Sequence, residues 1–304
     1  MLQSCFVRLR NYGVPGCGRV WRAWLVLEAN TTLANNSDLK VLILRTAGTN
    51  CDLELARAFE LAGASTTRLH INQLLSDASA FHRHQILAIP GGFSYGDDIA
   101  SGKILANQLI HHLKQPLQQW VADGKLIIGI CNGFQVLVKS GLLPGPMPQL
   151  ADDDWHPATL THNAHNRFED RWVHLRAESP LCKWLTPGQK LHLPIAHGEG
   201  RFVTRDAAVL SALKANHQIA LKYVDSLGNA ATNFPDNPNG STEAIAGICD
   251  ITGRVFGLMP HPERFADPLQ GPAWTSNLGI TQADGLQIFI NAVGFVRQKM
   301  AVAV

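Results

Sequence analysis

Short apolar runs alternate with longer segments of helical spacing between residues 39 and 141. Runs rich in Leu, Ile and Val are typical of buried strands, and apolar residues three or four positions apart are typical of helices. The expected strands are 39–45, 66–71, 84–92 and 125–130, and the expected helices are 52–64, 98–124 and 132–141. Gly63 is placed to end the first helix and Pro116 to break the second. Strands that alternate with helices predict a parallel sheet covered on both faces.

The pattern weakens after Gly141, where residues 142–157 have the proline-rich composition of a loop. Short strand-like runs and a closing helical pattern follow, at 158–162, 170–176, 190–195, 218–224, 244–249 and 254–258 for the strands and 283–300 for the helix. The sequence contains no internal repeat. We therefore predict one α/β domain with an added antiparallel section in its second half.

The composition argues against several classes of protein, among them nucleic-acid-binding, membrane-spanning and disulfide-rich proteins. Of the 304 residues, 46% are apolar and 16% are charged, and the formal net charge is +2. This charge is too small to suggest a nucleic-acid partner. No segment has the roughly eighteen uninterrupted apolar residues of a membrane helix. No C-x-x-C pair occurs, so neither a zinc site nor a small disulfide scaffold is indicated by Cys5, Cys17, Cys51, Cys131, Cys182 and Cys249. A reducing compartment is the simplest interpretation.

The first 38 residues differ from the rest of the chain. Four arginines and no acidic residue precede Glu28. An arginine-rich, acid-poor leader resembles an organelle transit peptide. The alternatives are a loosely ordered extension and an upstream start codon chosen in error, and we favour these. We expect residues 1–38 to be a poorly ordered basic extension and residues 39–304 to be the folded domain.

Cys131 lies between two glycines where an expected strand meets an expected helix, in Gly129-Ile130-Cys131-Asn132-Gly133. Such a turn is tight, so it needs small neighbours, and it lifts the side chain above the sheet. The start of the next helix favours a thiolate, and the amide of Asn132 can point at a developing oxyanion. The alternative is a buried structural cysteine. Open α/β sheets bind ligands at this end of their strands, which favours a nucleophile.

A thiol nucleophile needs a base, and the base needs an orienting partner. His261 and Glu263 lie two residues apart, directly after an expected strand, and prolines flank His261 on both sides. The prolines fix an extended or turn backbone here. In an extended chain this spacing sends both side chains the same way, so Glu263 could hold the imidazole. The alternative is an ordinary surface pair in a loop.

Two glycine-containing loops are further candidates. Pro90-Gly91-Gly92 lets backbone amides approach a ligand closely, which suits an oxyanion hole, although a strand-ending turn is the alternative. His197 and Glu199 flank Gly198, and a solvated turn is the alternative there. Metal binding is not expected, because no cysteine or carboxylate partner at ligand spacing accompanies His82, His84, His111, His112, His162 and His165.

Taken together, "LRTAGTNCD" (44–52), "PGGFSYGDD" (90–98), "GICNGFQVL" (129–137), "HGEGRF" (197–202) and "PHPER" (260–264) resemble the class I glutamine amidotransferases. More closely, they are similar to the glutaminase subunits of phosphoribosylformylglycinamidine synthase, an enzyme of purine synthesis. The resemblance runs from about Leu39 to about Gln298.

The resemblance implies a flavodoxin-like α/β fold, with a mostly parallel central sheet, flanking helices and a small antiparallel section. It also implies a triad in which Cys131 is the nucleophile, His261 the general base and acid, and Glu263 the orienting carboxylate. Glutamine would form a thioester on the cysteine and release ammonia. The residues expected to bind the oxyanion or the substrate are Gly91, Gly92, Asn132, Gln135, His197, Gly198 and Glu199.

The resemblance also implies partners. Ammonia would pass to an ATP-dependent synthetase subunit, with a small accessory subunit in the complex. No metal or cofactor is expected on this chain, because ATP and Mg²⁺ would bind the synthetase. A cytoplasmic location without membrane or nucleic-acid contacts is expected. Two alternatives are a stand-alone cysteine hydrolase of the same fold and a non-catalytic interaction subunit.

Overall fold

The computed structural model describes residues 39–147, 156–276 and 283–302, which belong to one compact unit. The expected basic extension, residues 1–38, lies outside the described residues. In the described part of the chain, no helix is both long and apolar enough to cross a membrane. Because residues 1–38 are not described, the expected division into an extension (1–38) and a folded domain (39–304) stays a prediction.

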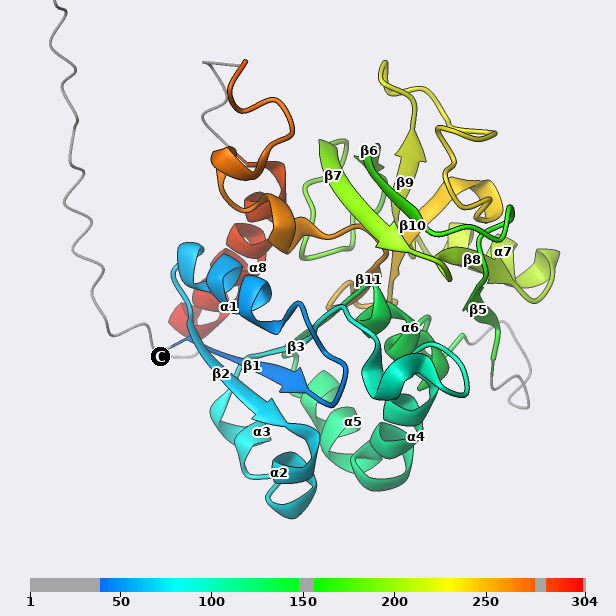
Figure 1. Ribbon diagram of the computed structural model, residues 1–304. Coiled ribbons are helices and arrows are strands. Elements are labelled where there is room, and N and C mark those ends of the chain that lie inside the picture. The colour runs from blue at the N-terminus through cyan, green and yellow to red at the C-terminus, as the bar shows by residue number, and fades with distance from the viewer. Residues whose placement is uncertain (1–38, 148–155, 277–282, 303–304) are drawn as a thin grey trace, which may run out of the picture. The chain divides into compact units, whose positions relative to one another are not determined.

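The strands form one large mixed sheet and a separate pair. They are β1 (Lys40–Arg45), β2 (Ser65–His70), β3 (Ile86–Ile89), β4 (Leu126–Ile130), β5 (Ala158–Thr161), β6 (Glu169–Ala177), β7 (Lys190–His197), β8 (Arg201–Thr204), β9 (Ile219–Val224), β10 (Ile245–Cys249) and β11 (Val255–Leu258). The nine-stranded sheet has the order β2-β1-β3-β4-β11-β10-β9-β6-β7 (Figure 1). Strands β2 to β11 in this order are parallel, and the later pairs are antiparallel. The parallel half has the flavodoxin-like order 2-1-3-4-5.

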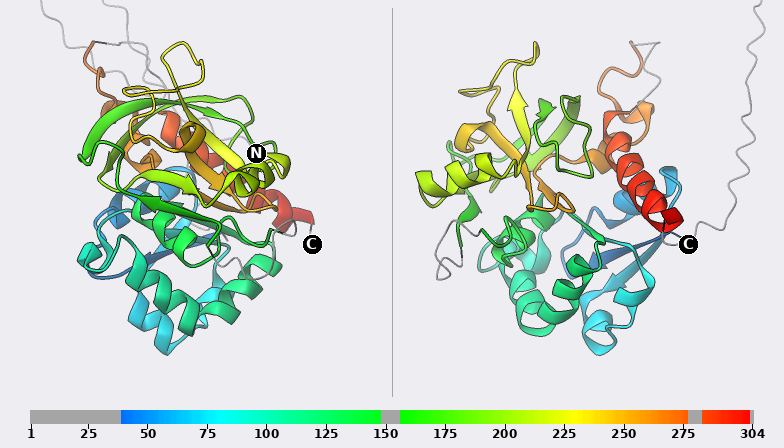
Figure 2. Two further views of the ribbon diagram at one scale, coloured as in Figure 1. Left: turned by 90° about the vertical axis from the view of Figure 1, so that its right-hand side faces the viewer. Right: turned by 180° about the vertical axis from the view of Figure 1, so that it is seen from behind.

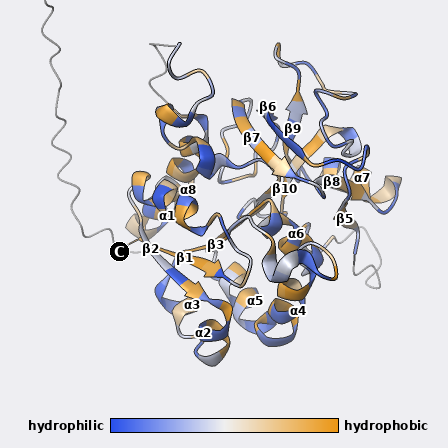
Figure 3. Ribbon diagram, viewed as in Figure 1, coloured by the Kyte–Doolittle hydropathy of each residue, from blue (hydrophilic) through white to orange (hydrophobic). Residues whose placement is uncertain are grey.

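Helices cover both faces of the parallel half. The helices are α1 (Asp52–Leu61), α2 (Ile71–Ser76), α3 (Ala80–Arg83), α4 (Lys103–His112), α5 (Lys114–Ala122), α6 (Asn132–Lys139), α7 (Ala207–Ala215) and α8 (Asp284–Val302), of which α7 packs against β8 instead. Helices α1 and α8 contact each other on one face, whereas α4, α5 and α6 lie on the other (Figures 1 and 2). The central strands are mostly apolar, and the helices carry both apolar and polar residues (Figure 3). This arrangement gives the buried, continuously apolar strands that the sequence pattern predicts.

The predicted fold class is confirmed, with differences in detail. The long helix expected at 98–124 divides at Leu113, and Pro116 lies in the first turn of α5, where its missing N–H is not needed. The short helices α2 and α3 were not predicted. Helix α7 was not predicted either, although Asp206 caps it by accepting a hydrogen bond from Val209 N–H at 2.9 Å. Strand β8 was also not predicted, because the glycines and charged residues before it indicate a loop.

Two glycines allow α6 to lie directly on the strands beneath it. A Cβ at Gly133 would be 2.0 Å from the carbonyl oxygen of Ile89 in β3, and a Cβ at Gly129 would be 2.5 Å from the carbonyl oxygen of Gly133. Real Cβ atoms do not approach backbone oxygen so closely. Neither glycine has the positive φ that would itself require glycine. The motif therefore needs glycine on both sides of the cysteine because three backbone segments meet there.

We predict that Gly133→Ala lowers the free energy of unfolding by about 1–3 kcal/mol or more, because the added methyl group overpacks fixed backbone. Gly294→Ala in α8 is the matched control, since nothing lies within 4 Å of its Cβ position. That variant should gain roughly 0.5–1 kcal/mol from helix propensity. Urea unfolding followed by circular dichroism measures both, and equal stability of the two variants would contradict the contact.

Candidate active site

The predicted chemistry gathers at the carboxyl ends of four parallel strands. Cys131 follows β4, Gly91 and Gly92 follow β3, and His261 follows β11, while Cys51 lies in the loop after β1. Open α/β sheets present their ligand sites at this edge. A cavity of about 150 Å³ lies here, and its walls include Cys131, His261, Glu199 and Gly92.

Cys131 has a strained backbone that aims its side chain into the cavity. Its φ of 51° and ψ of −106° lie outside the regions that non-glycine residues favour. Its N–H donates to the Leu258 carbonyl at 2.8 Å, and its carbonyl accepts from Phe134 and Gln135 in the first turn of α6. The helix therefore starts at the cysteine, and its N-terminal partial charge favours a negative group there. Only 7% of Cys131 is exposed.

His261 and Glu263 form a buried pair beside this thiol. The Nδ1 atom of His261 lies 2.6 Å from Oε1 of Glu263, and both side chains are almost fully buried. Their backbone is a 3₁₀ turn, Pro262–Phe265, with His261 as its N-cap. The predicted contact between the two side chains is thus present. Of the extended and turn conformations expected at these prolines the chain adopts the turn, whereas the spacing argument assumed an extended chain.

Burial and charge act in opposite directions on the pKa of His261. Burial lowers it, because the charged imidazolium loses water. The carboxylate of Glu263, together with the neighbouring Cys131, outweighs burial and raises the pKa well above its ordinary value. The pair at Nδ1 therefore favours a protonated imidazole, and it leaves Nε2, which has no hydrogen bond to any described residue, for chemistry.

The antiparallel half of the sheet fixes both residues. The N–H of His261 donates to the carbonyl of Pro194 at 2.8 Å, and the Cys131 thiol donates to the carbonyl of Ala196 at 3.7 Å. Both carbonyls belong to β7, an edge strand, which is where a sheet tolerates proline. Cys131 and His261 follow strands of the parallel half, and both are hydrogen-bonded to β7, a strand of the antiparallel half.

The residues expected to form an oxyanion hole lie around Cys131. A Cβ on Gly91 would be 2.8 Å from Cε1 of His261, and Gly92 has a φ of 137°. Asn132 opens α6, and the first amides of a helix have no acceptor within it. The Asn132 side chain has a different task, because it donates to Asp97 and accepts from Ser94 N–H, which ties the 94–97 turn to α6.

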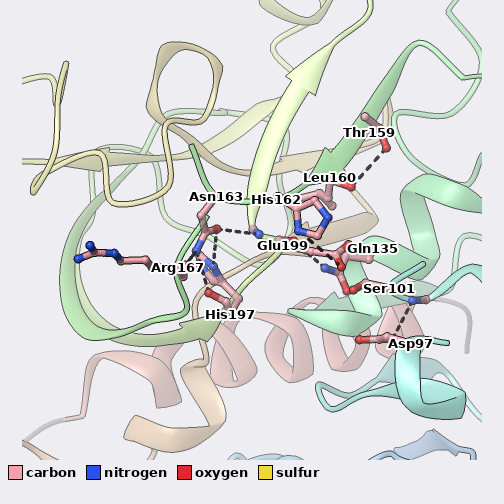
Figure 4. A network of polar contacts seen from close by, with 12 residues as sticks. Asp97, Ser101, Gln135, Thr159, Leu160, His162, Asn163, Arg167, His197 and Glu199 are labelled. Atoms are coloured by element: carbon pink, nitrogen blue, oxygen red, sulfur yellow. Dashed lines mark hydrogen bonds and ion pairs between the residues drawn. The ribbon is translucent and has the colours of Figure 1, made fainter. Parts of the chain in front are cut away.

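The other expected substrate-binding residues form the opposite wall of the cavity. The amide nitrogen of Gln135 donates to the carbonyl of Glu199 at 2.6 Å, so it holds the 197–200 loop in place (Figure 4). His197 is buried, and burial followed by the charge of His261 lowers its pKa to about 3. His197 is therefore neutral at physiological pH. Gly198 lies between His197 and Glu199, and all three residues line the cavity.

Asn163 organises this loop, and sequence reasoning did not single it out. Its side-chain oxygen accepts from Gly200 N–H at 3.1 Å and lies 3.2 Å from Nδ1 of His197, while its nitrogen donates to the carbonyls of Arg167 and His197 (Figure 4). The histidines on either side of it, His162 and His165, were expected to lack partners at metal-ligand spacing. Each of them meets a carboxylate from elsewhere in the fold, because His165 lies 3.1 Å from Glu169 and His162 lies 4.0 Å from Glu199, and neither pair belongs to a group of metal-ligand spacing among the described residues.

Cys51 and Arg264 were also missed. The guanidinium of Arg264 donates to the Cys51 sulfur at 3.1 Å and to Glu54 at 3.2 Å. Among the described residues, one cluster could hold a metal ion: Cys51, His261 and Glu263, whose donor atoms lie within 4.8 Å of one another. Cys51 could have been predicted from its position in the loop after β1, since that loop lies at the same edge of the sheet as Cys131.

Comparison with known proteins identifies the family. Residues 38–296 match the CobB/CobQ-like glutamine amidotransferase domain. The subunit PurQ of phosphoribosylformylglycinamidine synthase from Dehalococcoides mccartyi is 46% identical over 264 residues, which are 86% of this chain and 99% of that protein. The chain belongs to this glutamine amidotransferase family. The family resemblance predicted from the sequence motifs is thus confirmed.

Two further relatives agree. The PurQ subunit from Methanococcus maripaludis strain S2 is 43% identical, over 84% of this chain and 97% of that protein. A chain in the solved structure of PurLQS from Thermotoga maritima is 29% identical, with a TM-score of 0.61 over 85% of this chain and 99% of that chain. The relatives match the described domain along nearly their whole length.

We predict that Asn163→Ala lowers kcat/KM for glutamine by about tenfold or more, because the cavity wall at residues 197–200 loses its buried hydrogen bonds, each worth about 1 kcal/mol. Asn72→Ala, on the exposed surface of α2, is the control and should leave kcat/KM unchanged. Steady-state ammonia release measures both. An unaltered kcat/KM in the folded Asn163 variant would show that the loop does not depend on it.

Proposed function

We propose that this chain is the glutaminase subunit of phosphoribosylformylglycinamidine synthase and that it hydrolyses L-glutamine to glutamate and ammonia. The observation that carries the proposal is the strained Cys131 at the end of β4, beside the buried His261–Glu263 pair. A nucleophile, a base and an orienting carboxylate in this order are what amide hydrolysis through a covalent intermediate requires.

In the first step the Cys131 sulfur attacks the side-chain amide carbon of glutamine. His261 holds the thiol proton at Nε2, and Glu263 stabilises the imidazolium through Nδ1. The backbone amides of Gly92 and Asn132 stabilise the negative oxygen of the tetrahedral intermediate. The C–N bond then breaks, His261 gives its proton to the leaving nitrogen, and ammonia and a γ-glutamyl thioester result.

In the second step water hydrolyses the thioester. His261, now neutral, takes a proton from water as the water oxygen attacks the thioester carbon. The C–S bond breaks, the proton returns to the Cys131 sulfur, and glutamate leaves. The strain at Cys131 serves both steps, because it holds the sulfur at one position in the cavity.

Ammonia would pass to a synthetase subunit, which uses ATP to make formylglycinamidine ribonucleotide. The names of the relatives, and the complex that PurLQS denotes, support this partner and a small accessory subunit. We assign ATP and Mg²⁺ to the synthetase, no cofactor to this chain, and a cytoplasmic location without nucleic-acid or membrane partners. The free cysteines of the described residues fit a reducing compartment.

We predict that Cys131→Ala reduces glutaminase activity by at least about 10³-fold, because no other thiol lies at the start of α6. Cys182→Ala removes a buried thiol that does not line the cavity and serves as the control for protein handling. Ammonia release in the presence of the synthetase measures both, and full activity of Cys131→Ala would overturn the mechanism. Strong activity without the synthetase would favour a stand-alone hydrolase.

We predict that Glu263→Gln lowers the pKa of His261, because burial remains while the carboxylate charge is lost. Activity should fall by roughly 10²–10⁴-fold, since the imidazolium of each step loses its counter-charge. NMR titration of the imidazole measures the pKa. A pKa that stays as high as in the wild type would show that Glu263 does not set it.

A further inference from the structure

A strained turn at residues 95–97 reaches the cavity wall, and the proposed mechanism does not use it. Tyr95, Gly96 and Asp97 are three consecutive residues with a positive φ, of 56°, 71° and 55°. Such a backbone is costly for residues other than glycine, and it is found most often at binding and active sites. Asp97 lines the cavity that contains Cys131. Neither step of the proposed hydrolysis needs this carboxylate.

Asp97 and Glu199 belong to one hydrogen-bonded wall. The side-chain nitrogen of Asn132 donates to Oδ1 of Asp97 and to Oε1 of Gln135, in both cases at 3.0 Å. The side-chain nitrogen of Gln135 donates in turn to the carbonyl of Glu199 at 2.6 Å (Figure 4). Asp97, Gln135 and Glu199 all line the cavity. The first turn of α6 thus joins two carboxylate residues in one wall, while both polar atoms of the Gln135 side chain already have partners.

The charge of these carboxylates is incompletely balanced. Burial raises the pKa of Asp97, and the negative charge of Glu199 raises it further, against hydrogen bonds that lower it. Lys139 lies near both, but its Nζ donates to a backbone carbonyl at 2.6 Å and the residue does not line the cavity. Arg264 does line the cavity, but its guanidinium is bonded to Cys51 and to a carboxylate of α1. The wall therefore favours a positively charged ligand.

His197, two residues before Glu199, adds an acceptor without a donor. Oδ1 of Asn163 accepts from the N–H of Gly200 at 3.1 Å and lies 3.2 Å from Nδ1 of His197. The imidazole is neutral, because burial and the charge of His261 lower its pKa to about 3, so its one proton is on Nδ1 and Nε2 presents a lone pair. Nε2 is buried and has no hydrogen-bond partner among the described residues, and His197 lines the cavity. A ligand with N–H groups supplies what this wall lacks.

We propose that Asp97 and Glu199 bind the α-ammonium group of L-glutamine and so select this amino acid over other primary amides. An ammonium group brings both a positive charge and N–H donors, and it forms charge-assisted hydrogen bonds with carboxylates. An extended glutamine spans about 5 Å from its amide carbon to its α-nitrogen. Gln135 lies one helical turn, about 6 Å along the axis of α6, from Cys131. The amide carbon can thus lie at the sulfur while the ammonium group lies at the carboxylates. This choice of ligand rests on the proposed function.

The test compares L-glutamine with glutaramate, which has the same amide and carboxylate but no α-ammonium group. We expect the wild-type chain, assembled with the synthetase, to prefer L-glutamine in kcat/KM. Asp97→Asn should lower kcat/KM for L-glutamine by about 10–100-fold, mainly through KM, because a hydrogen bond between two charged groups is lost. The same variant should leave kcat/KM for glutaramate unchanged. Asp98→Asn removes the next carboxylate, which is exposed and outside the cavity, and should leave both values unchanged.

Glu199→Gln is the second variant, because it keeps the backbone carbonyl that Gln135 uses, and it should also lower the preference for L-glutamine. An unchanged preference in both folded variants would overturn the proposal. An equal fall of kcat/KM for both substrates would overturn it as well, because damage to the turn affects both alike. Weaker inhibition of Asp97→Asn by ammonium chloride, without a change in preference, would assign the wall to the product and not to the substrate.

Binding measurements separate this subsite from the proposed function. Calorimetry on the full chain with Cys131→Ala measures the Kd of L-glutamine and of glutaramate without turnover. If the assembled complex releases no ammonia from L-glutamine, the proposed function fails, and the subsite stands where Asp97→Asn removes the difference between the two Kd values. If L-glutamine is hydrolysed but Asp97→Asn changes neither KM nor Kd, the proposed function stands and the subsite fails.

Discussion

The direct backbone contact between α6 and the strands beneath it is the constraint on which the site depends. Gly133 lets the helix lie against the carbonyl of Ile89, and Gly129 lets β4 pass under the helix. With the helix held so low, the residue between strand and helix must turn sharply, and Cys131 adopts a φ of 51°. The surrounding hydrogen bonds hold this conformation at a cost of order 1–3 kcal/mol. One packing contact thus sets both the position of a helix and the direction of a thiol.

The antiparallel half of the sheet has a role beyond enlarging the core. A flavodoxin-like parallel sheet alone would leave its carboxyl edge open to solvent. Here β7 crosses that edge, and its carbonyls bond the backbone of His261 and the thiol of Cys131. The loop after β7 then closes the cavity, with Asn163 holding its backbone. Water exclusion strengthens the electrostatic effect of Glu263 on His261, because charges interact more strongly where the dielectric is low.

Strands β1, β3, β4 and β11 could be predicted from the sequence because they are buried on both faces and read as continuous apolar runs, whereas β2 is a mostly polar strand at the edge of the sheet. The turn at Cys131 could also be predicted, because Gly129 and Gly133, which it requires, lie within two residues of the cysteine in the sequence. Prediction failed where contacts between distant segments decide the outcome. Asn163 acts on residues 34 to 37 positions away, and Cys51 meets Arg264 across 213 positions. The His261–Glu263 contact was predicted from an extended chain, whereas a 3₁₀ turn produces it.

The turn that carries His261 and Glu263 is held from two directions. On one side the carbonyl of Pro194 in β7 accepts from the N–H of His261 at 2.8 Å. On the other side Arg264, in the same 3₁₀ turn, donates to the sulfur of Cys51 at 3.1 Å and to Glu54 at 3.2 Å, and both of these residues lie at the start of α1. The exposed pair with Glu54 contributes little stability, about 0–1 kcal/mol, because water screens it. The less exposed contact with Cys51 therefore makes the larger contribution, and it joins the loop after β1 to the turn after β11 at the edge of the sheet where Cys131 lies.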